Sequence, residues 1–215
     1  MTDERVQRGM RTQLSGWRSA LANADVERVG WKVGLNAPPV MEALELDRPV
    51  IGWIASGTLL EHPAEFPLAG TTRLGAEPEL AITVGEGGTV AALAPAIELV
   101  DIDKPFDDLV AILADNIFHR GVVFGAAVEA RPLRGITARI VRDGAPEAEL
   151  DLAETVGDPA EVVEIVGGRL EEAGEALQPG DRIIAGALTP ILWAEPGPSV
   201  ELDLGPLGAV SLRYA

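Results

Sequence analysis

Two glutamates separated by one residue, Glu77 and Glu79 in RLGAEPELAITV, carry the clearest chemical signal in this sequence. On an extended backbone, residues i and i+2 point to the same face, with their Cα atoms about 7 Å apart. Carboxylates placed in this way repel each other, and a divalent cation between them would remove the repulsion. Pro78 lacks an N–H, which predicts that the pair lies at a sheet edge or a bulge. A solvated face that carries both glutamates is the alternative interpretation.

A third carboxylate, Glu98 in LAPAIELVDID, lies in an apolar run of strand character. A lone carboxylate there would have to be paired or desolvated, unless the strand register turns it toward water. With Glu77 and Glu79 it predicts a metal site made of three carboxylates. Asp101 falls on the other face of the same strand, so we do not expect it to bind the same ion. Oxygen ligands favour Mg²⁺ or Mn²⁺.

Lys32, in GWKVGLN, is one of only two lysines, beside fifteen arginines. A partly buried lysine next to a metal could bind a substrate carboxylate or act as an acid. The alternative is a strand lysine whose stem is buried while its ammonium group reaches water. His119, in DNIFHRG, is interpreted most simply as a histidine at a helix end.

Composition excludes several other functions. The 215 residues contain no cysteine and two histidines, which excludes disulfides, thiol nucleophiles and thiolate or multi-histidine metal sites. The net charge of −17 makes nucleic acid and anionic membranes poor partners. The first residues, MTDERVQRGMR, do not resemble a secretory signal, and no apolar run approaches the ~20 residues of a membrane span. We expect a cytoplasmic protein.

The element pattern predicts an α+β protein in which strands dominate and helices pack at the sheet margins. Apolar spacing predicts helices over residues 3–27 and 106–117, and Asp158 and Pro159 predict the start of another. Extended segments are expected over 71–84, 90–102 and 136–141, among others. We expect one catalytic domain over 1–215, with an N-terminal helical segment at 1–29 and a β-rich roll at 30–215.

Several segments resemble, in order along the chain, the fumarylacetoacetate hydrolase superfamily. The resemblance is to its hydratase and decarboxylase branch, the 2-oxopent-4-enoate hydratases, 2-oxohept-4-ene-1,7-dioate hydratases and 4-oxalocrotonate decarboxylases of aromatic catabolism. It is carried by GWKVGLN at 30–36, RPVIGWI at 48–54, AEPELA at 76–81, PAIELVD at 95–101, ADN at 114–116 with GVVFG after it, and LQPGDRIIAGALTPI at 177–191.

The resemblance implies a mixed β-sandwich roll of the type found in the C-terminal part of fumarylacetoacetate hydrolase. It implies a Mg²⁺ or Mn²⁺ ion held by Glu77, Glu79 and Glu98, with Lys32 as the active-site lysine. The segment Gly186, Ala187, Leu188 and Thr189 would form a loop on the substrate side, with Thr189 at the substrate carboxylate. Relatives are dimers or larger assemblies, so a homo-oligomer is expected. One departure is Val50, which stands where hydratases of this branch carry an aspartate.

These features predict a metal-dependent lyase acting on a small unsaturated 2-oxo acid. A metal-bound keto oxygen and carboxylate would stabilise a dienolate. In hydration the dienolate is first protonated to the unsaturated ketone, to which water then adds, and in decarboxylation the same dienolate forms by loss of CO₂. We rank hydration of a 2-hydroxy-2,4-dienoate to a 4-hydroxy-2-oxo acid first and decarboxylation of the 4-oxalocrotonate type second. Two alternatives stay open: a hydrolase or tautomerase acting on acylpyruvates or oxaloacetate, and a non-catalytic subunit that associates with a related lyase.

Overall fold

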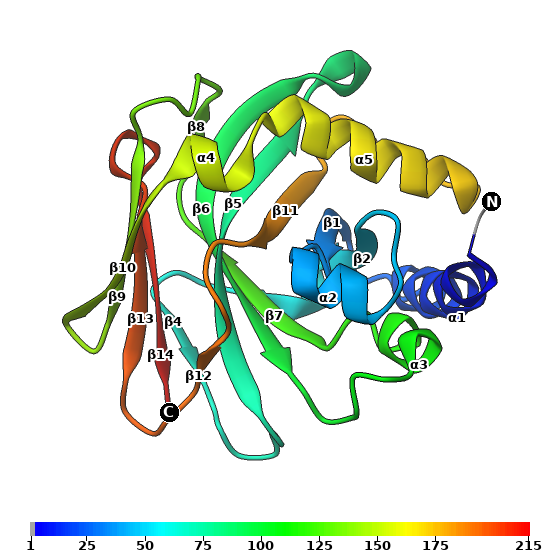
Figure 1. The fold of residues 1–215 in the computed structure, drawn as a ribbon, viewed down its shortest axis with the longest axis horizontal. Coiled ribbons are helices and arrows are strands. Elements are labelled where there is room, and N and C mark those ends of the chain that lie inside the picture. The colour runs from blue at the N-terminus through cyan, green and yellow to red at the C-terminus, as the bar shows by residue number, and fades with distance from the viewer. Residues whose placement is uncertain (1–2) are drawn as a thin grey trace.

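The structure is a computed structural model and describes residues 3–215. These residues form two curled sheets, with helices along the margin of the larger one (Figure 1). The nine strands of the larger sheet run in the order β2 (Val50–Ala55), β1 (Arg28–Gly34), β11 (Arg182–Ala187), β5 (Leu74–Val84), β6 (Val90–Asp101), β7 (His119–Phe124) and β3 (Leu59–Leu60), with β12 (Leu192–Trp193) paired to β5 and β8 (Val128–Glu129) to β6. Most pairs are antiparallel, whereas β1–β11 and β3–β7 are parallel.

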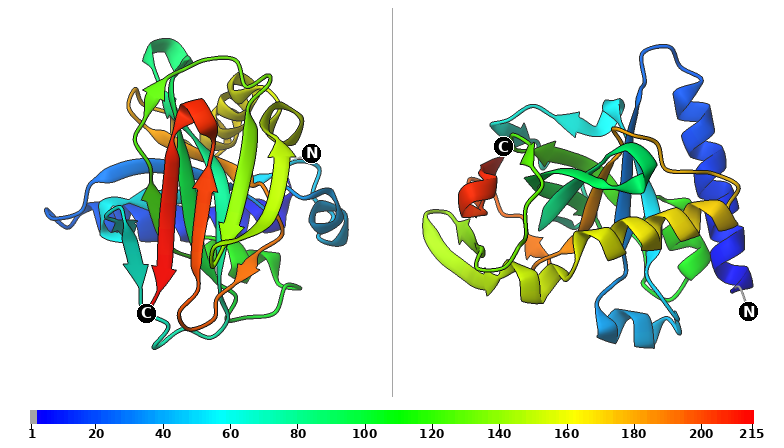
Figure 2. Two further views of the ribbon diagram at one scale, coloured as in Figure 1. Left: turned by 90° about the vertical axis from the view of Figure 1, so that its left-hand side faces the viewer. Right: turned by 90° about the horizontal axis from the view of Figure 1, so that it is seen from above.

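The smaller sheet has five strands and lies at the opposite end of the molecule from α1 (Figure 2). Its order is β10 (Ala145–Asp151), β9 (Thr137–Arg142), β13 (Ser199–Asp203), β14 (Ala209–Tyr214) and β4 (Ala64–Phe66). One apolar core joins the two sheets, with Leu80 and Ile97 from the larger sheet and Ile140 and Leu202 from the smaller one. This arrangement confirms the predicted strand-dominated roll.

Five helices occur within residues 3–215: α1 (Glu4–Leu21), α2 (Pro38–Ala43), α3 (Leu109–Ala114), α4 (Leu152–Val156) and α5 (Pro159–Glu172). Helix α1 packs on α3 and β2, and α5 packs on β11 and β2. None of the helices described has the length and apolar character needed to cross a bilayer. Helices α1 and α5 therefore cover the edge of the sheet where β2, β1 and β11 lie.

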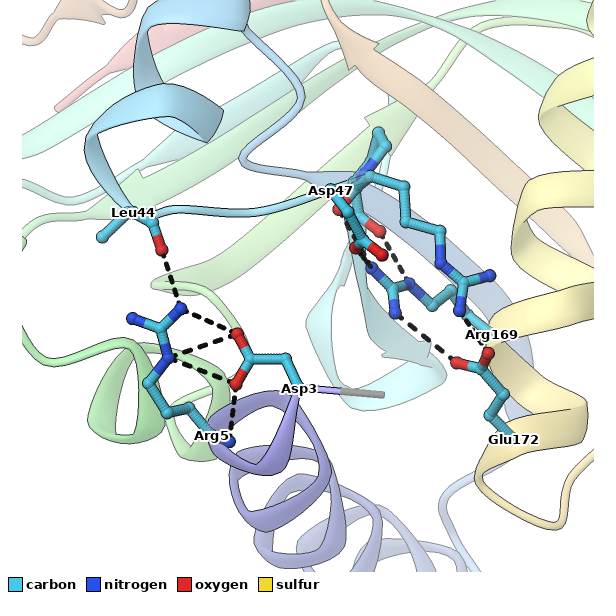
Figure 3. Close-up of polar contacts among 8 residues, drawn as sticks. Asp3, Arg5, Leu44, Asp47, Arg169 and Glu172 are labelled. Carbon is cyan, nitrogen blue, oxygen red and sulfur yellow. Dashed lines mark hydrogen bonds and ion pairs between the residues drawn. The ribbon is translucent and has the colours of Figure 1, made fainter. Parts of the chain in front are cut away.

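Two arginines tie these helices to the segment between α2 and β2, as Figure 3 shows. Arg5 of α1 donates to the carbonyl oxygen of Leu44 at 3.1 Å and is paired with Asp3. Arg169 of α5 is almost fully buried and donates to the carbonyl oxygens of Pro49 and Arg48 at 2.8 and 2.9 Å. Since these bonds hold the chain just before β2, they also fix the strand that pairs with Lys32 in β1.

The helix that we predicted from Asp158 is confirmed, because the Asp158 side chain accepts from the N–H of Ala160 and Pro159 is the first helical residue. The other two helices are shorter than predicted. The helix expected over 3–27 ends at Leu21, and the one expected over 106–117 spans only Leu109–Ala114. In the second case Asp108 caps the start, and left-handed backbone at residues 116–118 follows the end.

Pro78 is predicted at a sheet edge or a bulge. It does not lie at an edge, because β5 lies between β11 and β6, but it lies beside the bulge at which the register of β11 shifts between Ile184 and Ala187. The proline is accommodated because β11 pairs with β5 only from Glu79 onward and β12 only at Gly75 and Ala76. The missing N–H therefore faces the gap between β11 and β12, where no ladder bond is lost. Strand β1 begins at Arg28, near the expected start of the β-rich part, and the division of the chain at 29/30 stays a prediction.

The parallel pairing of β1 with β11 depends on Gly30, and this gives a testable prediction. Gly30 has φ +154°, and a Cβ there would lie 1.9 Å from the carbonyl oxygen of Arg182. We expect Gly30→Ala to lower the free energy of unfolding by about 3 kcal/mol or more, because the strands must separate. Urea denaturation measures this change.

The matched control is Gly16→Ala in the exposed middle of α1, where an added Cβ meets nothing within 4 Å. It should stabilise the protein by up to about 1 kcal/mol, because alanine is the better helix former. Equal stability of the Gly30→Ala variant and the wild type would contradict the proposed close approach of the strands.

Candidate metal centre

The three predicted glutamates converge on one face of the larger sheet. Glu77 lies directly opposite Glu98 in the β5–β6 pair, and Glu79 lies opposite Ala96, so all three side chains project from the same side. One carboxylate oxygen from each lies within 4.8 Å of the other two. Glu79 and Glu98 are buried, and Glu77 is half-buried. The solvated-face interpretation of these residues is therefore wrong.

Lys32 reaches the same cluster from β1 and is almost fully buried. Its Nζ donates to Glu98 Oε1 and, at 3.2 Å, to the carbonyl oxygen of Ile117. Gly52 in the neighbouring strand makes room for the lysine, since a Cβ there would lie 2.8 Å from Lys32 Cγ. The alternative in which the lysine ammonium reaches water is therefore wrong, and the ammonium compensates part of the carboxylate charge.

A bend in β11 supports the second glutamate. The register of β11 against β5 shifts between Ile184 and Ala187, and within this bulge the N–H of Gly186 donates to Glu79 Oε2 at 2.7 Å. Gly186 has φ +103°, and a Cβ there would lie 2.2 Å from Asn36 Nδ2. Only glycine therefore allows the close approach that fixes Glu79.

The turn after α3 forms another wall of the site in a strained conformation. Asn116, Ile117 and Phe118 all have φ between 53° and 60°, the left-handed region that β-branched residues such as isoleucine rarely adopt. The Asn116 side chain holds the turn in place, since it accepts from the N–H of Trp53 and donates to its carbonyl oxygen, both at 2.8 Å. This conformation is what turns the Ile117 carbonyl toward Lys32.

The surroundings of the three carboxyl groups shift their pKa values in different directions. Burial and the adjacent Glu98 carboxylate raise the pKa of Glu77 to about 7, against the opposing effect of Lys32. Burial, with the Glu98 and Glu77 carboxylates, raises the pKa of Glu79 well above its ordinary value. Burial acts the same way on Glu98, but Lys32 and His119 outweigh it and hold the pKa of Glu98 below its ordinary value. The cluster therefore carries more negative charge than one lysine neutralises once all three groups ionise.

The donor set fits a divalent cation. Glu98 Oε2 is buried and has no hydrogen-bond partner among residues 3–215, although its other oxygen has two. A buried carboxylate oxygen without a partner is costly, and a cation beside it removes the cost. Three carboxylates and no nitrogen or sulfur ligand make a site for hard ions such as Mg²⁺ or Mn²⁺.

A small cavity of about 60 Å³ opens beside the carboxylates. Its polar side chains are Lys32, Asn36, Glu77 and Glu79. The remaining lining is apolar apart from Gly34: Val33, Leu35, Val100, Ile102, Phe106, Ile117, Phe118, Ala187 and Ile191. Phe106 and Phe118 pack with ring centroids 5.3 Å apart, and Phe106 also lines a wider groove outside. The cavity thus has one charged end and one hydrocarbon wall.

The segment 186–189 lies beside this site. Gly186 binds Glu79, Ala187 lines the cavity, and the N–H of buried Leu188 donates to the Pro78 carbonyl oxygen at 2.9 Å. The hydroxyl oxygen of Thr189 is buried and has no hydrogen-bond partner in the described part of the chain. Contact of these residues with a substrate stays a prediction.

Asp101 lies apart from the cluster, as expected. Its carboxylate accepts from the backbone N–H groups of Thr72 and Arg73, the shortest contact being 2.6 Å, and so closes the turn before β5. Val50 is fully buried opposite Gly34 and does not line the cavity. Neither residue therefore contributes a polar group to the site.

His119 belongs to the site, and its predicted place at a helix end is wrong. It is not at a helix end, because α3 stops at Ala114 and His119 opens β7. Its Nδ1 lies 2.7 Å from Glu98 Oε1. The pairing of β7 with β6 skips Arg120, and such a bulge re-aims the side chains beside it. Nothing in the local sequence signals this bulge.

Comparison with known proteins agrees with the fold. No family model matches the chain. Over 86% of its length the chain is 28% identical to a protein named 4-oxalocrotonate decarboxylase from Pseudomonas sp, of which 77% is covered. It is 26% identical to 2-keto-4-pentenoate hydratase from Burkholderia vietnamiensis, with 86% of this chain and 78% of the relative covered. The curated relatives are thus named as decarboxylases and hydratases, as the resemblance implied.

Solved structures give the fold. The 4-oxalocrotonate decarboxylase from Pseudomonas putida G7, complexed with magnesium and adipate, superposes with a TM-score of 0.86 at 20% identity and covers 96% of this chain and 85% of its own. Fumarylpyruvate hydrolase from Pseudomonas aeruginosa, in complex with Mn²⁺ and pyruvate, has a TM-score of 0.67 at 19% identity. The match covers 90% of this chain and 93% of the hydrolase. The fold is therefore that of the fumarylacetoacetate hydrolase type, which confirms the expected resemblance.

The raised pKa values lead to a prediction about metal affinity and pH. Because Glu77 must lose a proton with a pKa of about 7 before it binds a cation, Mn²⁺ should bind about tenfold more tightly at pH 8 than at pH 6. Titration calorimetry at the two pH values measures this difference. An Mn²⁺ affinity that is independent of pH would show that the carboxyl groups do not bind the ion.

The stability of the metal-free protein should fall as the pH rises, whereas the Mn²⁺ affinity rises with pH. Glu77 and Glu79 have folded-state pKa values above those of the unfolded chain, so the folded state holds extra protons. Their stabilising contribution is complete below about pH 4.5 and is lost as the pH rises, through about 7 for Glu77 and through its own raised pKa for Glu79. Added Mn²⁺ should therefore raise the thermal midpoint more at pH 8 than at pH 6.

Proposed function

We propose that this chain is a divalent-metal-dependent lyase acting on a small unsaturated 2-oxo acid, with hydration of a 2-hydroxy-2,4-dienoate as the leading reaction. The observation that carries the proposal is the buried cluster of Glu77, Glu79 and Glu98 with an unpartnered oxygen on Glu98. The names of the relatives support the substrate class, since they are hydratases and decarboxylases of such acids. Solved relatives contain magnesium or manganese, which supports Mg²⁺ or Mn²⁺ here.

The three glutamates would hold the cation, which supplies Lewis-acid stabilisation of negative charge on the keto oxygen of a 2-oxo acid. Lys32 carries a proton on Nζ at the charged end of the cavity and is the group that would deliver it to the far carbon. The apolar wall excludes bulk water and fits the hydrocarbon part of the substrate. The unpartnered Thr189 hydroxyl, beside Gly186, Ala187 and Leu188, is a donor for the substrate carboxylate.

Decarboxylation of the 4-oxalocrotonate type is the second candidate, and a specific observation favours it. Besides a proton donor, hydration needs a polar group that orients water at the carbon next to the protonated one, and the wall formed by Phe106, Phe118 and Ile191 offers none. Loss of CO₂ needs only the stabilised dienolate and a proton donor. Buried Val50, at the aspartate position of the hydratases, agrees with this candidate.

The remaining expectations belong to the same proposal. We propose a single catalytic domain over 1–215 in a cytoplasmic homo-oligomer, without nucleic acid or membrane partners. If the chain is not catalytic, it would act as a subunit that associates with a related lyase. That role predicts assembly or metal binding without turnover, whereas the hydrolase or tautomerase alternative predicts turnover of acylpyruvates or oxaloacetate instead.

A direct assay tests the proposed function. With Mg²⁺ or Mn²⁺, the purified protein should remove the dienol absorbance of 2-hydroxypenta-2,4-dienoate or release CO₂ from 4-oxalocrotonate, and a chelator should abolish the activity. Glu79→Gln should weaken Mn²⁺ binding by about 100-fold or more, because it removes a charged ligand. Absence of metal-dependent turnover of both substrates would refute the lyase assignment, and unchanged behaviour of Glu79→Gln would favour the non-catalytic subunit.

A lysine variant separates the proton donor from the metal ligands. Lys32→Met should lower kcat by about 10²- to 10⁴-fold, the usual contribution of a general acid. Lys104→Met is the matched control, since the other lysine pairs with Asp103 and Asp115 outside the cavity. Steady-state kinetics with saturating Mn²⁺ measure both. Wild-type kcat in the Lys32 variant would remove this residue from the mechanism.

A further inference from the structure

Glu98 is held from two sides through the same oxygen. Lys32 Nζ donates to Oε1 from β1, and His119 Nδ1 lies 2.7 Å from Oε1 from β7. The other oxygen, Oε2, has no hydrogen-bond partner within residues 3–215. Because the two oxygens of a carboxylate turn together about χ3, contacts that fix Oε1 also fix the direction in which Oε2 points.

His119 is itself fixed by a further contact. Its Nε2 lies 2.9 Å from the hydroxyl oxygen of Thr58, and that hydroxyl lies 3.1 Å from the carbonyl oxygen of Ala55. The side chain of His119 is 1% exposed. Thr58 ends a short 3₁₀ turn (Ser56–Thr58) that leads into β3, the strand beside β7. The histidine is therefore clamped between the backbone at Ala55 and the carboxylate.

The two contacts to Glu98 are not equivalent. Lys32 lines the substrate cavity, whereas His119 does not. If Lys32 turned toward a substrate and nothing else held Glu98, the carboxylate would lose its only fixed partner. His119 supplies a second partner that no substrate in the cavity would contact.

We propose that His119 is a positioning residue that, together with Thr58, orients Glu98 as the third metal ligand and leaves Lys32 free to serve the substrate. The proposal rests on the divalent-metal site of the proposed function. Groups that hold a metal ligand in this way commonly contribute 10- to 100-fold in metal affinity. The role needs only the position of the ring beside Glu98 Oε1.

A second cavity makes the proposal testable by chemical rescue. A surface cavity of about 200 Å³ reaches His119 and Thr58 and shares no lining residue with the cavity at the carboxylates. It also reaches Asn116 and Arg120. Removal of the imidazole ring would extend this cavity to Glu98, so free imidazole could enter and take the place of the side chain.

The experiment measures Mn²⁺ binding to the 215-residue chain by titration calorimetry. His119→Ala should weaken Mn²⁺ binding by 10- to 100-fold, and millimolar imidazole should restore most of the loss. His119→Asn, whose amide can reach the carboxylate, should lose less. Thr58→Val should weaken binding by a few fold, and Thr58→Ser, which keeps the hydroxyl, should bind as the wild type does.

Four results decide between the interpretations. Wild-type Mn²⁺ affinity in His119→Ala would overturn the proposal, and so would a loss that imidazole does not reverse. If His119→Ala fails to fold, equal Mn²⁺ affinities of Thr58→Val and Thr58→Ser would overturn it instead. Failure of the wild-type protein to bind Mn²⁺ would refute the metal site and with it the proposed function, which distinguishes the two failures.

Discussion

The burial of three carboxyl groups next to one another is the constraint on which the rest of this structure depends. Ionised carboxylates within 4.8 Å repel by on the order of 3 kcal/mol per pair at an effective dielectric of about 20. Lys32 offsets part of this charge, and the raised pKa values of Glu77 and Glu79 remove another part by protonation. A cation is the third form of compensation, and it is the only one that leaves all three groups ionised and Lys32 free.

The irregular features of the larger sheet serve this cluster. The bulge in β11 brings the N–H of Gly186 to Glu79, and the bulge in β7 brings His119 to Glu98. The left-handed turn at 116–118 brings the Ile117 carbonyl to Lys32. In a regular antiparallel sheet the backbone N–H and carbonyl groups bond to the neighbouring strand. The bulges and the left-handed turn therefore supply the site with polar contacts that regular pairing would not give.

The cavity divides into a charged end and an apolar wall, and this division is the chemical basis of the proposed lyase activity. The charged end contains the groups that would stabilise an enolate and move a proton, whereas the wall around Phe106 and Phe118 contains no group that orients water. Hydratases and decarboxylases need the same charged end and differ in what surrounds the far carbon of the substrate. The distinction between the two reactions therefore lies in the wall and not in the metal ligands.

The amino-acid sequence alone determined the acidic trio, Lys32, the dominance of strands and the Asp158 cap, because each depends on residue type and local spacing. The roll itself was implied by the resemblance of several segments to a known family. Tertiary structure decided the position of Pro78 in an interior strand, the length of the helix after Asp108, and the contact of His119 with Glu98. These features depend on which strands pair and where a bulge shifts the register. Pairing between distant segments is set by the energy of the whole sheet, and no local pattern of residues reports it.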